Sequence, residues 1–444
     1  MFHKLIFTIG YLLKRPEVLR YYFNFQKTQW RSYEWLKNQQ EMQLKKLIDF
    51  AYKNIPYYTK LFDQMGIKSS DIAVIKDLEK LPVLTKETIK ENWQDFIPKN
   101  INELKHLSGS TGGSTGASLK YRMSKEDYEK GVALLYRWWG YGGYKLSNKV
   151  AIIAGSSLVP TSKSESKKKI QDFFFNFRHY SSFEMSQKNL FKYFDNINKW
   201  KPGFIMGYAS SIYLFAQFIQ DNNLKLNFKP KAILTTSEKL FDKQRIFIES
   251  IFNAKIFDGY GLNDGGVTAF ECEKHCGMHI DMERSILEVV DNKGGQIINQ
   301  QGKILATSLY NYALPFIRYD TGDLGIISDK ECSCGRGTPL LKEISGRITD
   351  FLKINNIIIG SPVLTVLMGK FDITQYQIIQ DHPTSIIIKV VKGKTYNEKS
   401  DEEFIKKSFY SHVGEFDIIF EYTNFIPIAE GKKYKFIINN LTEL

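Results

Sequence analysis

Apolar positions in the middle of the chain follow two different spacings. Three short apolar runs, each next to Gly, Thr or Asp, are typical of buried parallel strands. They cover residues 149–155, 231–235 and 255–260. Three further segments repeat apolar residues at the spacing of an amphipathic helix, and these are 124–136, 211–220 and 241–252. Strands that alternate with helices predict an α/β fold with a mostly parallel sheet, in which ligands bind at the carboxyl ends of the strands.

The two ends of the chain have other patterns. Residues 1 to about 95 are predicted to be helical, with a break at Pro56, because the residue before a proline avoids the α region. Short strand-like runs separated by Gly, Asn and Asp predict a β-rich subdomain at about 284–345. The remaining residues mix strands with one helix and predict a small α+β domain. We therefore expect a large N-terminal domain, 1–349, and a C-terminal domain, 350–444.

Composition and charge narrow the possible partners. The 444 residues are 43% hydrophobic and 14% aromatic, which describes a folded protein with room for two or more domains. The formal net charge is +13, but Lys is spread along the whole length, so we expect no nucleic-acid partner. Residues 2–23 mix aromatic, apolar and basic side chains and predict a core helix, with peripheral membrane contact as the alternative. No secretory signal is recognisable, which predicts a cytoplasmic protein without disulfides.

A run of Ser, Thr and Gly occupies residues 108–116. Gly lets the backbone take positive φ and approach a ligand closely, and successive N–H groups then form a concave nest for an anion. The run favours a site for nucleotide phosphates, with a flexible linker as the alternative. It is not a Walker-type loop, because no Gly-Lys-Ser/Thr ends it.

All four cysteines lie in two tight clusters. The first cluster holds Cys272, His275, Cys276 and His279, and the second holds Cys332 and Cys334. Cys and His that cluster in a reducing compartment predict a tetrahedral zinc site. Four protein ligands leave no open position for water, so this zinc would be structural. Ordinary reduced thiols are the alternative.

Several motifs occur in a set order. They are the Ser/Thr/Gly loop, 260–266 (YGLNDGG), 318–324 (RYDTGDL), and finally 345–350 (SGRITD) with Gly431 and Lys432. Together with 56–58 (PYY), 81–92 (LPVLTKETIKEN) and 234–240 (LTTSEKL), they resemble the adenylate-forming enzyme superfamily over nearly the whole chain. The closest likeness is the phenylacetate–CoA ligase branch, including the CapK-like enzymes of capsule biosynthesis clusters.

The resemblance implies a two-step ligase reaction. A carboxylate attacks the α-phosphorus of ATP, pyrophosphate leaves, and the acyl-adenylate passes to a nucleophile such as the thiol of coenzyme A, or to a sugar or amine. It also implies Mg²⁺, a small carboxylic acid as substrate, and a C-terminal domain that rotates between the two half-reactions. An AMP-transferring nucleotidyltransferase and a non-catalytic nucleotide-binding protein are the alternatives, and a homodimer is left open.

The resemblance assigns nucleotide contacts residue by residue. Those expected at the phosphates are Ser108, Ser110, Thr111, Gly113, Ser114, Thr115 and Gly116, in two registers of which 113–116 is preferred. Those expected at the adenosine are Ser237, Glu238, Tyr260, Gly261, Asn263, Asp323 and Arg347. In these roles Tyr260 stacks on adenine, Asp323 accepts from the ribose hydroxyls, and Arg347 reaches ribose or phosphate.

The catalytic and metal-binding residues complete the set. Asp264 would hold Mg²⁺, although the family usually has Glu there and Thr or Ser in place of Asn263. Lys432 would deliver its charge to the α-phosphate, with Lys433 and Lys435 as close alternatives, and Asp350 would be the hinge. For zinc the family pattern favours Cys272, His279, Cys332 and Cys334. A Gly/Asp turn at Asp264 or Asp323, and a solvated basic hairpin at Lys432, are the non-catalytic interpretations.

Overall fold

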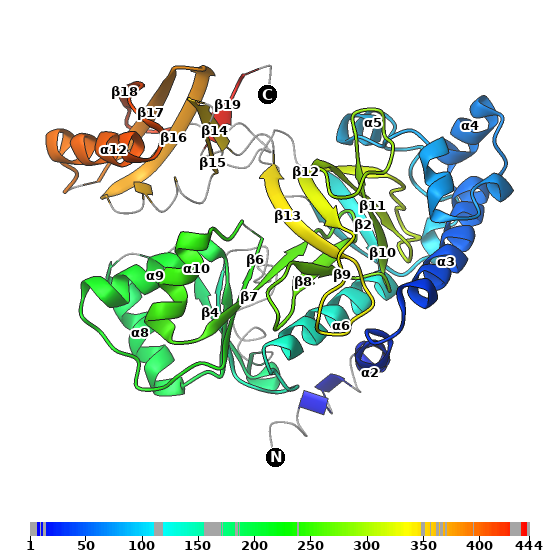
Figure 1. The fold of residues 1–444 in the computed structure, drawn as a ribbon, viewed down its shortest axis with the longest axis horizontal. Helices are drawn as coiled ribbons and strands as arrows, with labels where there is room; N and C mark the ends of the chain where they lie inside the picture. The colour runs from blue at the N-terminus through cyan, green and yellow to red at the C-terminus, as the bar shows by residue number, and fades with distance from the viewer. Residues whose placement is uncertain are drawn as a thin grey trace.

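A computed structural model of the chain has a large α/β body and a smaller C-terminal body (Figure 1). It describes residues 7–8, 10–11, 15–110, 119–154, 170, 172–182, 185, 187–237, 239–347, 351–355, 357–360, 364, 367–368, 371–393, 395–426 and 437–441. In Figure 1 the blue N-terminal helices border the yellow strands, and the orange elements form the separate C-terminal body.

The N-terminal part is helical, as predicted. It comprises α2 (Pro16–Thr28), α3 (Tyr33–Asn54), α4 (Pro56–Met65), α5 (Lys86–Glu91) and three 3-10 helices, η1 (Ser69–Asp71), η2 (Ile75–Lys80) and η3 (Ile101–Glu103). The Ser32 side chain begins α3 by accepting a hydrogen bond from the Trp35 amide. Ile55 is extended and ends α3 directly before Pro56, so the predicted break is confirmed.

An 11-stranded sheet runs through the large body, in the order β10-β11-β12-β13-β9-β8-β7-β6-β5-β3-β4. Its parallel strands are β3 (Val150–Ala154), β4 (Phe177–Ser181), β5 (Phe204–Gly207), β6 (Ala232–Thr236) and β7 (Lys255–Gly261). The three predicted strands correspond to β3, β6 and β7, and the predicted α/β fold is confirmed.

Helices cover both faces of the parallel strands. They are α6 (Lys125–Tyr141), α8 (Gln187–Trp200), α9 (Ala209–Asp221) and α10 (Asp242–Phe252). Successive strand residues point to opposite faces, so Ile152 belongs to the same apolar cluster as Trp138 of α6, and Ile153 to that of Phe215 of α9. Because both faces are buried, these strands are rich in apolar residues, and β3 is apolar at every position, which is why it stands out in the sequence.

Antiparallel strands continue the same sheet beyond β7. They are β8 (Thr268–Glu271), β9 (Met278–Ile280), β10 (Ser285–Val290), β11 (Gly302–Ser308), β12 (Tyr319–Ser328) and β13 (Leu340–Arg347). The strands predicted in the β-rich segment therefore pair within the main sheet. One strand-like run, 296–300, forms only an isolated bridge between Val290 and Gln296. The Gln296 amide donates instead to Glu79 Oε1, at 2.7 Å.

A two-stranded antiparallel sheet carries the two ends of the Ser/Thr/Gly loop. Its strands are β1 (His106–Ser110) and β2 (Lys120–Ser124), and Ser110 pairs with Lys120. The pairing brings residue 110 beside residue 120, so whatever conformation residues 111–118 adopt, the loop must begin and end at one place.

The C-terminal body has its own core. Its elements are β14 (Phe351–Ile354), β15 (Ile357–Gly360), β16 (Ile373–His382), β17 (Ser385–Lys392), α12 (Glu398–Val413), β18 (Asp417–Tyr422) and β19 (Ile437–Asn439). Four of the strands form a sheet in the order β18-β17-β16-β19, and Ile388, Ile405 and Phe409 belong to the buried cluster beside it. The predicted small α+β unit is thus present.

Near the N-terminus, the described residues belong to the core. Phe7 and Tyr11 are buried and share an aromatic cluster with Tyr136 of α6. The core interpretation of this segment therefore holds for these two side chains. Among the described helices, none combines the length and the apolar character needed to span a bilayer.

Candidate nucleotide and metal sites

A tight turn follows the carboxyl end of β7 and presents Asp264. The turn is closed by hydrogen bonds from Gly266 N to Leu262 O and from Leu262 N to Val267 O. Gly266 has a φ of 71°, and a Cβ there would lie 2.6 Å from Ser308 Oγ, so only glycine fits. Asp264 is 6% exposed and its Oδ2 accepts a hydrogen bond of 2.8 Å from the Tyr319 hydroxyl. The carboxylate is therefore held in a fixed orientation.

Tyr260 of β7 connects this turn to β12. Its hydroxyl donates to Asp323 Oδ2 at 2.8 Å, and Asp323 is itself only 6% exposed. Burial, with a further contribution from the Asp323 charge, raises the pKa of Tyr260, so the phenol stays protonated and keeps donating. The backbone register pairs Asp323 with Arg347 of β13.

Strand order alone would keep these residues apart. Three strands, β8, β9 and β13, stand between β7 and β12 in the sheet. The Tyr260–Asp323 and Tyr319–Asp264 hydrogen bonds nevertheless join β7 and its turn to β12. The sheet must therefore curl, and the curl brings two acidic side chains from distant segments to the same end of β7.

The β1–β2 sheet lies against the same turn. Tyr121 of β2 sits over Gly109 of β1, where a Cβ would come within 2.5 Å of the Tyr121 ring. Burial raises the pKa of Tyr121, the Asp264 charge adds to the effect, and a hydrogen bond with Asn263 opposes it. Tyr121 therefore places the ends of the Ser/Thr/Gly loop beside Asn263 and Asp264.

The predicted nucleotide, hinge and catalytic residues fall into three groups. Those that the structure describes, in or shortly after β1, β6, β7 and β12, are Ser108, Ser110, Ser237, Tyr260, Gly261, Asn263, Asp264 and Asp323. Those that lie outside the described residues are Thr111, Gly113, Ser114, Thr115, Gly116, Glu238, Asp350 and Lys432. For Arg347 the backbone is described and the side chain is not. Residues 345–347 end β13, so this motif begins within the main sheet.

Two contributors were not identified from the sequence. Tyr319 and Tyr121 contact the predicted acidic turn, yet neither had been given a role. Tyr319 lies inside the 318–324 motif, so a tyrosine next to a run of Asp and Gly was the available signal. Tyr121 carried no signal, because its part depends on the pairing of β2 with β1.

The second cluster is the predicted zinc site. One ligand atom from each of Cys272, His279, Cys332 and Cys334 lies within 4.8 Å of the other three. Cys272 Sγ and Cys332 Sγ are 3.7 Å apart, and Cys334 Sγ is 3.3 Å from His279 Nε2. These separations match the edges of a tetrahedron around an ion with Zn–S of about 2.3 Å and Zn–N of about 2.0 Å.

The surroundings of the cluster also fit a metal. The Lys274 amide donates to Cys272 Sγ and the Arg336 amide to Cys334 Sγ, at 3.4 and 3.5 Å, which stabilises thiolates. Thr338 Oγ1 lies 2.8 Å from His279 Nδ1 and leaves Nε2 facing the cysteines. Burial and then the Arg336 charge lower the pKa of His279 to about 4, so the imidazole is neutral and able to bind a metal.

The alternative ligands are directed elsewhere. His275 Nδ1 is 3.2 Å from Glu271 Oε1. Cys276 is exposed and its thiol donates to the Lys274 carbonyl oxygen. Neither is part of the four-residue cluster, which consists of the favoured set.

Known proteins are similar to this sequence over most of its length. A family profile described as the CapK C-terminal domain matches residues 351–440. Protein CapK of Staphylococcus aureus is 27% identical over 420 residues, covering 90% of this chain and 89% of CapK. The phenylacetate-coenzyme A ligase of Thermus thermophilus is 24% identical over 415 residues, covering 86% of this chain and 84% of that enzyme.

The chain is a relative of CapK and of the phenylacetate–CoA ligases. Solved structures agree on the fold. A 2-hydroxyisobutyryl-CoA ligase in its postadenylation state, in complex with R3-HIB-AMP, matches with a TM-score of 0.66 and 17% identity, covering 91% of this chain and 89% of that one. The same enzyme with 2-HIB-AMP and CoA, in the thioesterification state, matches with a TM-score of 0.61. The adenylate-forming ligase fold predicted from the motif order is confirmed.

Proposed function

We propose that the protein is an acid–thiol ligase that converts a carboxylic acid and ATP into an acyl-adenylate and pyrophosphate, and then transfers the acyl group to coenzyme A. The observation that carries the proposal is the convergence of Asp264 and Asp323 at one end of β7, through hydrogen bonds from Tyr319 and Tyr260. The relatives named phenylacetate-coenzyme A ligase support the same chemistry.

The acidic residues have distinct proposed roles. A buried carboxylate such as Asp323 suits the ribose hydroxyls, because it accepts two hydrogen bonds from a diol, and Tyr260 keeps it in place. Asp264 supplies oxygen ligands, which Mg²⁺ prefers, and Tyr319 orients it. When bound, Mg²⁺ neutralises phosphate charge as pyrophosphate leaves. Ser108 and Ser110 begin the loop proposed to hold the phosphates.

The C-terminal domain is proposed to change position between the two steps. In this scheme Asp350 is the hinge, Lys432 approaches the α-phosphate during adenylation, and Arg347 contacts the nucleotide. A lysine suits the first role because it places a compact positive charge on the developing phosphoryl charge. The division into 1–349 and 350–444 is part of this proposal, and it is supported by the separate core of the C-terminal body.

A structural zinc is proposed for Cys272, His279, Cys332 and Cys334. The four residues come from β9 and from loops after β8 and β12, so a bound ion would tie these segments together. The ion would stabilise the antiparallel half of the sheet and take no part in the reaction.

The biological setting is proposed from the relationship to CapK. The acid is inferred to be small or aromatic, the protein is placed in the cytoplasm, and its product would serve capsule or surface polysaccharide biosynthesis. Transfer to a sugar or an amine instead of coenzyme A is the alternative for the second step.

Acid-dependent exchange of pyrophosphate into ATP tests the first step. We expect exchange with at least one acid of a panel of aryl and small aliphatic carboxylates, and a thioester when CoA is added. AMP transfer to another molecule without acid dependence would favour a nucleotidyltransferase, and ATP binding without exchange would favour a non-catalytic protein. Lys432→Ala should abolish exchange but leave transfer from preformed adenylate, whereas the matched control Lys435→Ala should retain both. If Lys432→Ala exchanges normally, the lysine role belongs elsewhere.

A further inference from the structure

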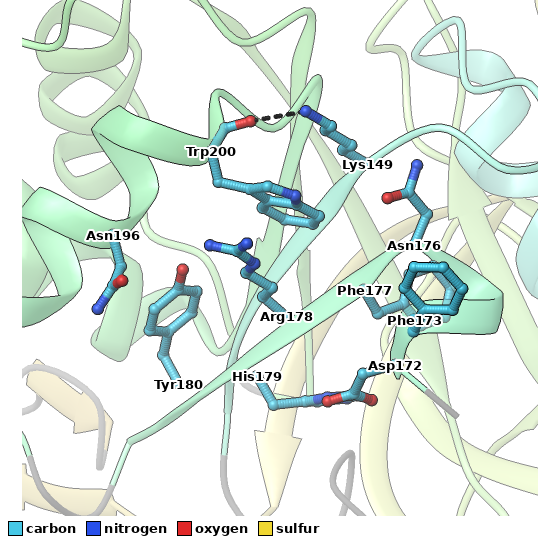
Figure 2. Close-up of a pocket in the computed structure, with 10 residues that line it drawn as sticks. All are labelled: Lys149, Asp172, Phe173, Asn176, Phe177, Arg178, His179, Tyr180, Asn196 and Trp200. Carbon is cyan, nitrogen blue, oxygen red and sulfur yellow. Dashed lines mark hydrogen bonds and ion pairs between the residues drawn. The ribbon is translucent and has the colours of Figure 1, made fainter. Parts of the chain in front are cut away.

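A cavity of about 650 Å³ opens beside β4, the last strand of the main sheet. Figure 2 shows its walls, which come from β4 and the segment before it, from α8 and from the residue before β3. Two cationic side chains, Lys149 and Arg178, and the indole of Trp200 meet in this space. The volume is in the range of small-molecule sites, which is about 300–1,000 Å³.

Trp200 holds both cations. Arg178 Cζ lies 4.7 Å and Lys149 Nζ 5.6 Å from the centroid of the indole ring. Lys149 Nζ also donates to the Trp200 carbonyl oxygen at 3.0 Å, the dashed line in Figure 2. A guanidinium stacked on an aromatic ring keeps its N–H fork available in the plane, and that fork matches the oxygens of a phosphate.

The carboxylate of the cavity wall pairs with a histidine and not with the two cations. The carboxylate in the lining, Asp172, lies 3.1 Å from His179 Nδ1. Within the part of the chain that the structure describes, no carboxylate lies within 4 Å of Lys149 or Arg178. Arg178 is exposed and Lys149 is half-buried, so two cations that have no carboxylate partner within 4 Å face the opening and can attract an anion.

The cavity is separate from the proposed nucleotide site. Lys149 precedes β3, whereas Asp264 follows β7, so the two lie at opposite ends of parallel strands. The order β7-β6-β5-β3-β4 also places β4 four strand spacings from β7, which is about 19 Å. A ligand in the cavity therefore does not share the ATP-binding residues.

An exposed aromatic ring borders the cavity. Phe173 lines the cavity and is 57% exposed. An exposed ring beside a cationic pocket can cover the organic part of a ligand whose anionic group reaches the cations.

We propose that this cavity is a second binding site, in which Arg178 and Lys149 bind the phosphate group of an organic phosphate ester and Phe173 contacts its organic part. The phosphate can belong to a soluble phosphorylated compound or to the headgroup of an anionic phospholipid. The site does not depend on the proposed ligase function, because none of its residues belongs to the ATP-binding set.

Two probes distinguish the two possible sources of the phosphate group. Calorimetry with phenyl phosphate tests the soluble form, and co-sedimentation with vesicles of phosphatidylglycerol and phosphatidylcholine tests the lipid form. We expect wild type to bind at least one probe, and Arg178→Ala to bind it at least tenfold more weakly, since charge-assisted hydrogen bonds to phosphate are lost. Lys243→Ala removes an exposed lysine of α10 and is the charge-matched control, which should bind like wild type.

Further variants guard against a folding defect. Lys149→Gln replaces a side chain at the rim and should also weaken binding, and unfolding midpoints are compared for every variant. Arg178→Lys should bind with intermediate affinity, because it keeps the charge and loses the fork. Loss of phenyl phosphate binding alone identifies a soluble ligand, and loss of vesicle binding identifies a lipid. The proposal is overturned if wild type binds neither probe, or if Arg178→Ala and Lys149→Gln bind as wild type does.

Discussion

Replacing Cys334 with serine removes one of the four ligand atoms around the proposed zinc position. A tetrahedral ion with Zn–S of about 2.3 Å separates two sulfurs by about 3.8 Å, and sulfur from nitrogen by about 3.5 Å. The separations in the protein are 3.7 Å for Cys272 and Cys332 and 3.3 Å for Cys334 and His279. An ion therefore fits with shifts of a few tenths of an ångström, and little rearrangement opposes its binding.

The energetic consequence follows from linkage. Zinc at about a thousand times its dissociation constant adds about 4 kcal/mol to the free energy of unfolding. A serine hydroxyl is a poor zinc ligand, so Cys334→Ser should lose most of this stabilisation. Cys276→Ser is the matched control, because Cys276 is exposed and its thiol donates only to a backbone carbonyl.

The test measures the zinc content of wild type and of both variants, and their thermal unfolding midpoints with and without a chelator. We expect about one zinc per chain in wild type and Cys276→Ser, and less than half a zinc in Cys334→Ser. The chelator should lower the unfolding midpoint of the first two proteins and leave the third unchanged. Folded wild type with less than half a zinc per chain, or Cys334→Ser with a full zinc, would refute the assigned ligands.

Three further substitutions test other parts of the structure. Burial raises the pKa of Asp258 to about 7 in the folded protein, whereas in the unfolded chain the carboxyl ionises at about pH 4. Between these two pH values the folded state binds one more proton than the unfolded state, so the free energy of unfolding should fall as pH rises from about 4 to 7. Asp258→Asn should remove at most about 4 kcal/mol of that fall, measured by denaturant unfolding across this range; an unchanged slope would contradict the assignment. Thr338→Val frees the His279 ring and should weaken zinc binding about 10- to 100-fold in a chelator competition, while equal affinity would exclude a positioning role. Asp323→Asn should raise the KM for ATP in the exchange assay about tenfold or more, and an unchanged KM would remove Asp323 from the ribose site.

Much of the fold was predictable because the parallel strands are buried on both faces. Every residue of β3 and the first three residues of β6 are apolar, and this leaves runs that no amphipathic helix would have. The break before Pro56 was predictable for a local steric reason, since it depends on two adjacent residues. The grouping of Cys272, His279, Cys332 and Cys334 was predictable, because Cys and His are few and fall close together in the sequence.

Features that depend on distant contacts were not predictable. β4 lies at the edge of the sheet and mixes Arg, His and Tyr with Phe, so its pattern resembles a loop more than a buried strand. The contact of Tyr319 with Asp264 requires the sheet to curl past three intervening strands, and no local spacing encodes that curl. Asp127, an acidic residue in the first turn of α6, is buried against Arg284, which lies 157 positions away in the sequence, so no local pattern encodes this contact either.

A crystal structure of the protein with an acyl-adenylate mimic tests most directly whether the nucleotide binds at the carboxyl end of β7. With a 5′-O-acylsulfamoyl adenosine, we predict adenine against Tyr260, the ribose hydroxyls on Asp323, and the sulfamoyl group facing Asp264 and the loop after β1. A mimic bound in the Lys149–Arg178 cavity, or anywhere away from Asp264 and Asp323, would contradict the proposed ligase site.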